Sequence, residues 1–123
     1  MKTYLKILIL SFLIGFSLEI SQEEDLLKNI INTTVTAYSE FDGCNNPGCL
    51  MANNKKAHIG AIACPRTIKL GTKVQVYGQV YICSDRMNKR YTNRFDIFTG
   101  YGKEAHKKAM DFGIRKTTVL LLD

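Results

Sequence analysis

A series of short strand-like segments constrains the fold of this chain more than any other feature of its sequence. The segments are rich in β-branched, aromatic and other apolar residues, as β-strands are. They span residues 33–38, 59–64, 73–77, 80–83, 94–98 and 117–122. Gly78 and Gln79 separate two of these segments, which predicts a tight β-hairpin turn at these two residues. A stretch rich in turn residues, 40–56, follows the first segment.

One helix is expected among these strands, at residues 103–112. Its sequence places Ala105, Ala109 and Phe112 on one face and lysines on the other, as in an amphipathic helix. Gly113 follows at the position where helices commonly end. Six short strands and one short α-helix in roughly 90 residues predict a mainly β protein, a small closed six-stranded barrel.

The beginning of the chain has the features of a secretory signal. Lys2 and Lys6 precede an apolar run at residues 7–16, and small residues follow. We expect a signal peptide over residues 1–21, with Ser17 or Ser21 at the cleavage site and an uncleaved anchor as the alternative. The apolar run is short for a membrane-spanning helix, so no stable membrane insertion is expected after cleavage.

The rest of the chain is long enough for one ordinary domain. Residues 22–32 are expected to form a linker or a short helix, and residues 33–123 the barrel domain. The expected location is secreted, periplasmic or associated with the cell wall, and a monomer is expected.

An exported chain with four cysteines favours disulfide bonds, and four cysteines allow three pairings. Residues 45–48 form turns readily and bring Cys44 and Cys49 together, which leaves Cys64 and Cys83 to pair across two strands. A zinc site is the alternative. The cysteine spacings fit no common zinc motif, so neither a metal nor another cofactor is expected.

The positive charge of the chain lies mostly in one region. The whole chain has a formal charge of +6, and residues 55–116 hold 14 Lys and Arg against four Asp and Glu. Much of this charge is expected to form a solvated surface. An acidic polymer such as the cell wall is the expected partner. Nucleic acid is not expected, because the chain is exported and matches no common nucleic-acid module.

Two carboxylates in this basic region are candidates for catalysis. Asp96 lies between Phe95 and Ile97 in an apolar strand, a setting that raises the pKa of a carboxyl group and suits a general acid. Asp85 adjoins Arg86 at a strand end and is expected to stay ionised. That contrast suits acid-assisted cleavage of a glycosidic bond. The alternative is two ordinary ion pairs, Asp85 with Arg86 and Asp96 with its neighbour Arg94.

Five motifs resemble a known family, and they occur in the family's order. They are Val35-Thr36-Ala37-Tyr38, Ile62-Ala63-Cys64-Pro65 with Ile68-Lys69-Leu70-Gly71-Thr72-Lys73-Val74, Ser84-Asp85-Arg86-Met87-Asn88, Asn93-Arg94-Phe95-Asp96-Ile97-Phe98 and Ala109-Met110-Asp111-Phe112-Gly113. Over residues 35–122 the chain resembles the 3D (three-aspartate) domain. That domain is similar to the catalytic barrel of membrane-bound lytic transglycosylase A and, more distantly, to expansins.

The resemblance implies a double-psi β-barrel with an open acidic groove. It implies that Asp96 is the catalytic acid and Asp85 the second aspartate, and it assigns Thr36, Tyr38 and Arg94 to substrate binding. The chain departs from the family in two places. Cys64-Pro65 replaces the Asp-Pro of the first aspartate, and the Gly-Gly that often follows the second aspartate is absent. A bridge from Cys64 to Cys83 agrees with the pairing given above.

The implied activity is that of a secreted peptidoglycan lytic transglycosylase. One aspartic acid would cleave the MurNAc-GlcNAc bond and give 1,6-anhydro products, and the substrate would be peptidoglycan or another wall glycan. The alternative is a wall-binding or expansin-like wall-loosening module that breaks no bond, and a secreted effector or phage lysis factor with the same barrel is a third possibility. Tyr38, Tyr91 and Tyr101 are candidates for stacking on sugars. Both histidines are expected on the surface without a role.

Overall fold

The structure is a computed structural model that describes residues 28–44 and 48–122. The expected signal peptide at 1–21, and the part of the expected linker at 22–27, lie outside the described residues. The chain divides into two units, 1–30 and 31–123, and only the second is described almost throughout.

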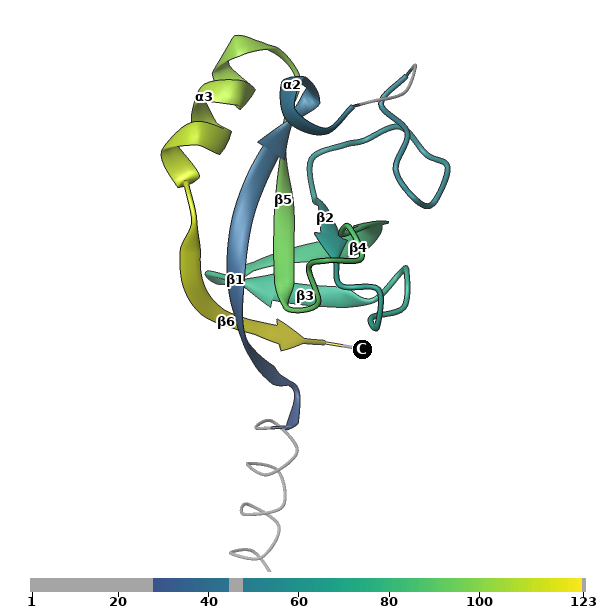
Figure 1. The fold of residues 1–123 in the computed structure, drawn as a ribbon, viewed down its shortest axis with the longest axis vertical. Helices are drawn as coiled ribbons and strands as arrows, with labels where there is room; N and C mark the ends of the chain where they lie inside the picture. The colour runs from purple at the N-terminus through teal and green to yellow at the C-terminus, as the bar shows by residue number, and fades with distance from the viewer. Residues whose placement is uncertain (1–27, 45–47, 123) are drawn as a thin grey trace, which may run out of the picture. The chain divides into compact units, whose positions relative to one another are not determined.

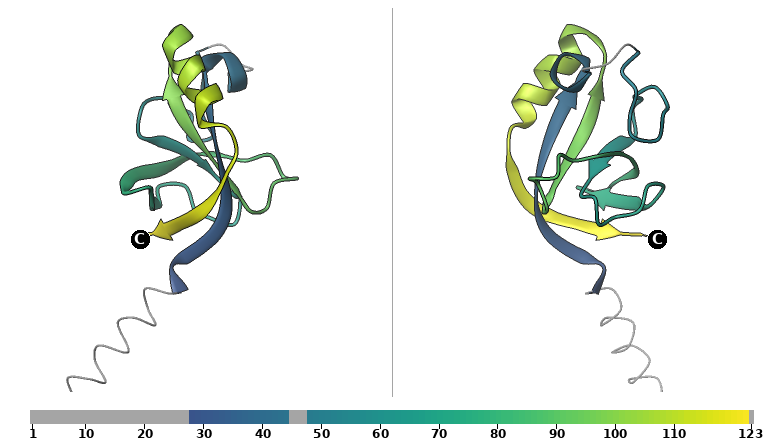
Figure 2. Two further views of the ribbon diagram at one scale, coloured as in Figure 1. Left: turned by 90° about the vertical axis from the view of Figure 1, so that its left-hand side faces the viewer. Right: turned by 45° about the vertical axis from the view of Figure 1, so that its right-hand side comes forward.

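The domain is a closed barrel of six strands, as predicted (Figure 1). Around the barrel the strands follow the order β1-β5-β2-β4-β3-β6. Their bounds are β1 Ile30–Ser39, β2 Ala61–Cys64, β3 Lys73–Val76, β4 Gln79–Arg86, β5 Arg94–Gly100 and β6 Arg115–Leu121. Among the residues that the structure describes, the helices are α2, Glu40–Gly43, and α3, Gly102–Phe112. Both helices lie at one end of the barrel, away from the end of β6 (Figure 2).

Three local predictions differ from the structure. Residues 30–32, expected in the linker or short helix, are strand, and Asn93 Nδ2 donates to the Asn32 carbonyl there at 3.0 Å. The hairpin turn is Tyr77-Gly78 and not Gly78-Gln79. Both turn residues have positive φ, 48° and 75°, as the tight turn that best matches strand twist requires. The single turn α2 lies in the stretch expected to be only turns.

Strand pairing brings the two candidate aspartates to one face of the sheet. The parallel pair β1–β5 sets Thr36 beside Asp96, and the antiparallel pair β2–β5 sets Ala63 on the other side of Asp96. The parallel pair β2–β4 has a register shift after Ile62, so that Ala63 also pairs with Asp85. Directly paired residues project from the same face of a sheet. The aspartates therefore flank Ala63, the smallest chiral side chain.

Two clusters of buried residues hold the domain together. The larger fills the barrel with side chains from all six strands, namely Val35, Ile62, Cys64, Val74, Val76, Cys83, Phe95, Ile97 and Val119. The smaller lies on the aspartate side, where the long connection between α2 and β2 packs on the sheet. It contains Tyr38, Met51, Ala57, Ala61, Ala63, Met87 and Phe98. The alternation along β5 sends Phe95 and Ile97 inward and leaves Asp96 on the opposite face.

Both predicted disulfides are confirmed. Cys64 in β2 is bonded to Cys83 in β4, and Cys44 is bonded to Cys49 at the end of α2. The first bond lies in the core, where both cysteines are fully buried. Two disulfides are compatible with an oxidising, extracellular location. In the described part of the chain no helix is both long enough and apolar enough to cross a membrane.

Candidate functional site

A groove of about 440 Å³ lies over the face that carries the two aspartates. Its lining comes from β1, α2, β2, β4, β5 and the connection between β4 and β5. The side chains that matter below are Thr36, Tyr38, Asp42, Asp85, Arg94 and Asp96. All five site residues predicted from the sequence therefore line one groove, together with a third aspartate, Asp42.

Asp96 is the buried acid of this groove. Burial raises the pKa of its carboxyl group to about 6, and the negative charges of Asp42 and Asp85 act in the same direction. The hydrogen bond from Thr36 and the charge of Arg94 oppose the rise without cancelling it. A carboxyl group with this pKa holds its proton in mildly acidic solution and can give it to a substrate.

Thr36 joins Asp96 to Arg94. The Thr36 hydroxyl donates to Asp96 Oδ1 at 3.0 Å and accepts from Arg94 Nε at 3.2 Å. Among the described residues no ion pair forms between Arg94 and Asp96, so the pairing considered from the sequence is replaced by a link through Thr36. This arrangement fixes the acid and keeps a positive charge near it without direct contact.

Asp85 is held in a different way. Its Oδ1 accepts the backbone N–H groups of Ala52 at 3.0 Å and Arg86 at 2.9 Å, and its Oδ2 accepts the Tyr38 hydroxyl at 3.3 Å. Asp85 thus bonds to the backbone of Arg86 and not to its guanidinium group. These contacts make Asp85 a fixed acceptor that ties β4 to β1 and to the connection before β2.

Tyr38 lies at the floor of the groove with only 7% of its surface exposed. Burial, followed by the charges of Asp85 and Asp96, raises the pKa of its hydroxyl well above the usual value. Tyr38 therefore remains a neutral phenol, and its ring packs on Phe98 with 5.2 Å between centroids. Tyr91 also lines the groove, whereas Tyr101 lines a separate pocket of about 510 Å³.

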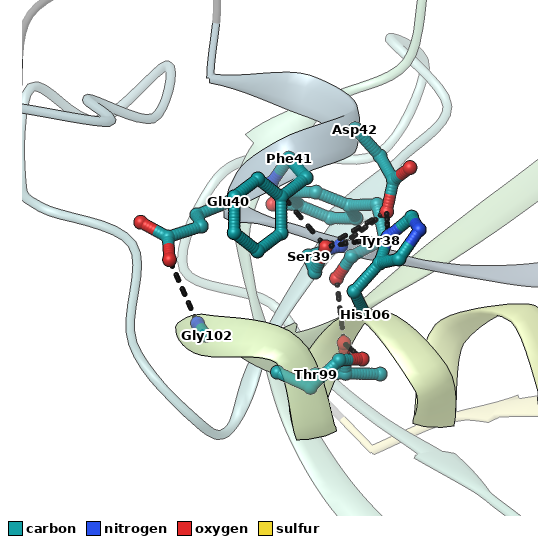
Figure 3. Close-up of polar contacts among 9 residues, drawn as sticks. Tyr38, Ser39, Glu40, Phe41, Asp42, Thr99, Gly102 and His106 are labelled. Atoms are coloured by element: carbon teal, nitrogen blue, oxygen red, sulfur yellow. Dashed lines mark hydrogen bonds and ion pairs between the residues drawn. The ribbon is translucent and has the colours of Figure 1, made fainter.

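Asp42 and His106 were missed by sequence reasoning, which gave neither residue a role. Figure 3 shows His106 of α3 reaching the Asp42 carboxylate of α2, with 3.4 Å between Nδ1 and Oδ2. Ser39 caps α2, and both its backbone N–H and its hydroxyl donate to the same Asp42 oxygen, at 3.0 and 2.9 Å. The motif Ser39-x-x-Asp42 is a capping box, the one sequence signal that pointed to this cluster.

The pKa of Asp42 reflects these contacts. Burial alone would raise it, but the hydrogen bonds from Ser39 and the proximity of His106 outweigh burial and lower the pKa. A further contact joins the two helices, because Glu40 Oε1 accepts the Gly102 N–H at 2.7 Å at the start of α3 (Figure 3). Helix α2, which forms one end of the groove, is therefore held in place by hydrogen bonds to α3.

By the resemblance of the sequence to the 3D domain, Cys64 stands where that domain has its first aspartate, so no carboxyl group is present at this position. Cys64 is buried in the disulfide with Cys83, and it does not line the groove. Within residues 28–44 and 48–122 no group of three Asp, Glu, His or Cys side chains is arranged to bind a metal ion. A comparison with protein-family models finds no family that matches the chain. A comparison with curated proteins finds no match either.

Proposed function

We propose that this protein is a secreted peptidoglycan lytic transglycosylase whose acid and base are one residue, Asp96. The observation that carries the proposal is a largely buried carboxyl group with a pKa of about 6, fixed by Thr36 on the wall of an open groove. Asp85 and Asp42 also line the groove, but their hydrogen bonds already hold them in place as acceptors. Asp96 is therefore the proton donor in this proposal.

The proposed reaction needs no water. Protonated Asp96 gives its proton to the oxygen between the MurNAc and GlcNAc residues, and the bond from that oxygen to C1 of MurNAc breaks. The 6-hydroxyl oxygen of the same MurNAc bonds to C1, and its proton passes to the Asp96 carboxylate. The products are a 1,6-anhydro end and a free GlcNAc hydroxyl, and the acid is regenerated. Because the nucleophile belongs to the same ring, proximity replaces the second carboxylate of ordinary glycosidases.

The other groove residues have roles in binding under this proposal. Thr36 holds the acid, and Arg94 is held by Thr36. Tyr38, a neutral phenol bonded to Asp85, supplies a fixed polar group on the groove floor. We also propose that the barrel has double-psi topology, since two parallel strand pairs, β1–β5 and β2–β4, are joined by the antiparallel pair β2–β5.

A second function is supported by one observation, the absence of a carboxyl group at Cys64. Loss of one acid of the family pattern suits a wall-binding module that breaks no bond. Its basic residues would attach it to anionic wall polymers.

Product identity separates the two functions. The mature protein is incubated at about pH 5 with purified murein, with and without its stem peptides, and the soluble fraction is analysed by mass spectrometry. Muropeptides with 1,6-anhydro ends support the transglycosylase, and reducing ends would indicate a hydrolase instead. Retention of the protein on murein, weakened by salt and without soluble products, would favour the binding module.

A further inference from the structure

Two arginines line the groove that contains Asp96, and the Arg86 side chain is the more available of the two. Only the backbone N–H of Arg86 is used by Asp85. Within the described residues its guanidinium group has no hydrogen-bond or ion-pair partner. A charged group in a groove costs free energy when a neutral ligand covers it, because the ligand removes water without replacing its hydrogen bonds.

Arg94 is held in a fixed orientation. Its Nε donates to Thr36 at 3.2 Å, and its guanidinium carbon lies 4.7 Å from the centre of the Tyr91 ring. Within the described residues its Nη groups have no partner. Because Arg94 is held at Nε and by stacking on Tyr91, its two Nη groups remain available to a ligand. Two Nη groups can donate to the two oxygens of one carboxylate.

The distance between Arg94 and the acid limits where a negative charge on the substrate can be. The same Thr36 hydroxyl contacts Arg94 Nε and Asp96 Oδ1, at 3.2 and 3.0 Å, so these two atoms lie within the span of one sugar residue. The other carboxylates of the groove are occupied, Asp85 by three donors and Asp42 by Ser39 and His106. Their contacts reduce the repulsion that a substrate anion would meet.

We propose, resting on the function proposed above, that the substrate glycan carries a free carboxylate on the sugar at the bond that is cleaved, bound by Arg86 and Arg94. Two glycans meet this requirement. One is a murein strand without stem peptides, in which the lactyl group of the muramyl residue ends in a free carboxylate. The other is a glycan in which a uronic acid is the leaving sugar, next to a sugar that supplies the 6-hydroxyl. In the first case a reaction that hydrolyses the lactyl amide bond must act before this protein.

The test compares three forms of one glycan. Murein strands are prepared with stem peptides, after enzymatic removal of the peptides, and after conversion of the freed carboxylates to methylamides. Cleavage is measured as anhydro product formed, and binding is measured separately as retention on immobilised strands at pH 8. An oligouronide and its methyl ester form a second pair, used for binding alone because an oligouronide has no 6-hydroxyl that could close on C1.

The wild-type protein is expected to cleave and bind the free-carboxylate strands at least tenfold better than the methylamide strands. The double variant Arg86→Gln, Arg94→Gln is expected to lose this preference. Its control, Lys69→Gln with Lys73→Gln, removes the same charge from an exposed turn and strand outside the groove and is expected to keep the preference. Circular dichroism establishes that both variants are folded. The comparison of the glycan forms with the wild-type protein tests the inference even if a variant does not fold.

The outcomes separate this inference from the proposed function. Equal cleavage of the carboxylate and methylamide strands overturns the inference and leaves the transglycosylase in place. If no murein form is cleaved but the oligouronide binds better than its ester, the carboxylate site stands and murein is the wrong substrate. If each free-carboxylate glycan and its methylamide or ester bind equally well, the carboxylate site is overturned whether or not cleavage occurs. A preference for the free carboxylate that survives in the arginine double variant overturns it as well.

Discussion

At the residue scale, the groove contains carboxylates of one chemical type in different surroundings. Asp96 is largely buried with one hydrogen-bond donor, whereas Asp85 accepts three donors. The sequence allowed the first environment to be predicted, since Asp96 is flanked by Phe95 and Ile97 in a strand. The link from Asp85 to Tyr38 was not predictable, because it depends on the register between strands far apart in the sequence.

Burial of Asp96 makes folding depend on pH in a defined direction. Its pKa rises from an ordinary value of 3.8 to about 6, so the folded protein keeps this proton over a range in which the unfolded chain loses it. The contribution of Asp96 to stability therefore falls as pH rises from about 4 to 6 and is constant above that range. Asp96→Asn removes this cost.

Asp96→Asn is expected to be more stable than the wild type by about 2–3 kcal/mol at pH 7.5, and the difference should disappear near pH 4. Urea unfolding at both pH values measures it. Asp111→Asn, at an exposed position on α3, is the control and should change little. A wild type that is the more stable protein at pH 7.5 would contradict the burial of this carboxyl group.

Thr36 has an effect of its own on the acid. Its hydrogen bond lowers the pKa of Asp96, so Thr36→Val, which keeps the shape of the side chain, should raise that pKa further. The carboxyl carbon of Asp96 can be followed by NMR during a pH titration of both proteins. An unchanged or lower pKa in the variant would mean that Thr36 does not donate to this carboxyl group.

At the scale of elements, the strands and α3 were predictable because their patterns are local. Alternating or continuous apolar residues marked every strand, and the apolar face with Gly113 marked the helix. The one-turn helix α2 was not predicted, since four residues are too few to show a helical period. Its place in the groove comes from contacts with α3, made by Glu40 to Gly102 and by Asp42 to His106.

Ser39 is the residue on which α2 depends. It is fully buried, and its hydroxyl both accepts the Phe41 N–H and donates to Asp42. Ser39→Ala is expected to lower the free energy of unfolding by about 1–2 kcal/mol through loss of this cap. Urea unfolding tests this, with the exposed Thr67→Ala as the control. A loss no larger than that of the control would show that the capping box does not stabilise the fold.

At the scale of the whole molecule, the closed barrel is held by the core and by two disulfides of different span. The bond Cys64–Cys83 joins residues 19 apart and Cys44–Cys49 joins residues 5 apart. In the chain-entropy account, longer closed loops give more stability. The disulfide pairing was predictable because a turn-forming stretch separates Cys44 from Cys49. The order of strands around the barrel was not, because it depends on crossover connections that local sequence patterns do not specify.

Replacing each disulfide by two alanines tests this difference. Loss of Cys64–Cys83 is expected to cost about 3 kcal/mol, and loss of Cys44–Cys49 about 2 kcal/mol. The first variant also loses two buried sulfur atoms from the core, which adds to its cost. Thermal unfolding of the two variants and the wild type shows which disulfide contributes more to stability. The reverse order would contradict the central position of the Cys64–Cys83 bond.

The function proposed for the whole molecule rests on one carboxyl group, Asp96, and one rate measurement tests this proposal most directly. The initial rate at which 1,6-anhydro products are released at about pH 5 is compared for wild type, Asp96→Asn and Asp111→Asn, on murein strands with and without stem peptides. We predict a loss of at least about 100-fold for Asp96→Asn, as expected for a general acid, and an unchanged rate for Asp111→Asn. Release by Asp96→Asn at the wild-type rate would contradict the assignment of Asp96 as the acid and base.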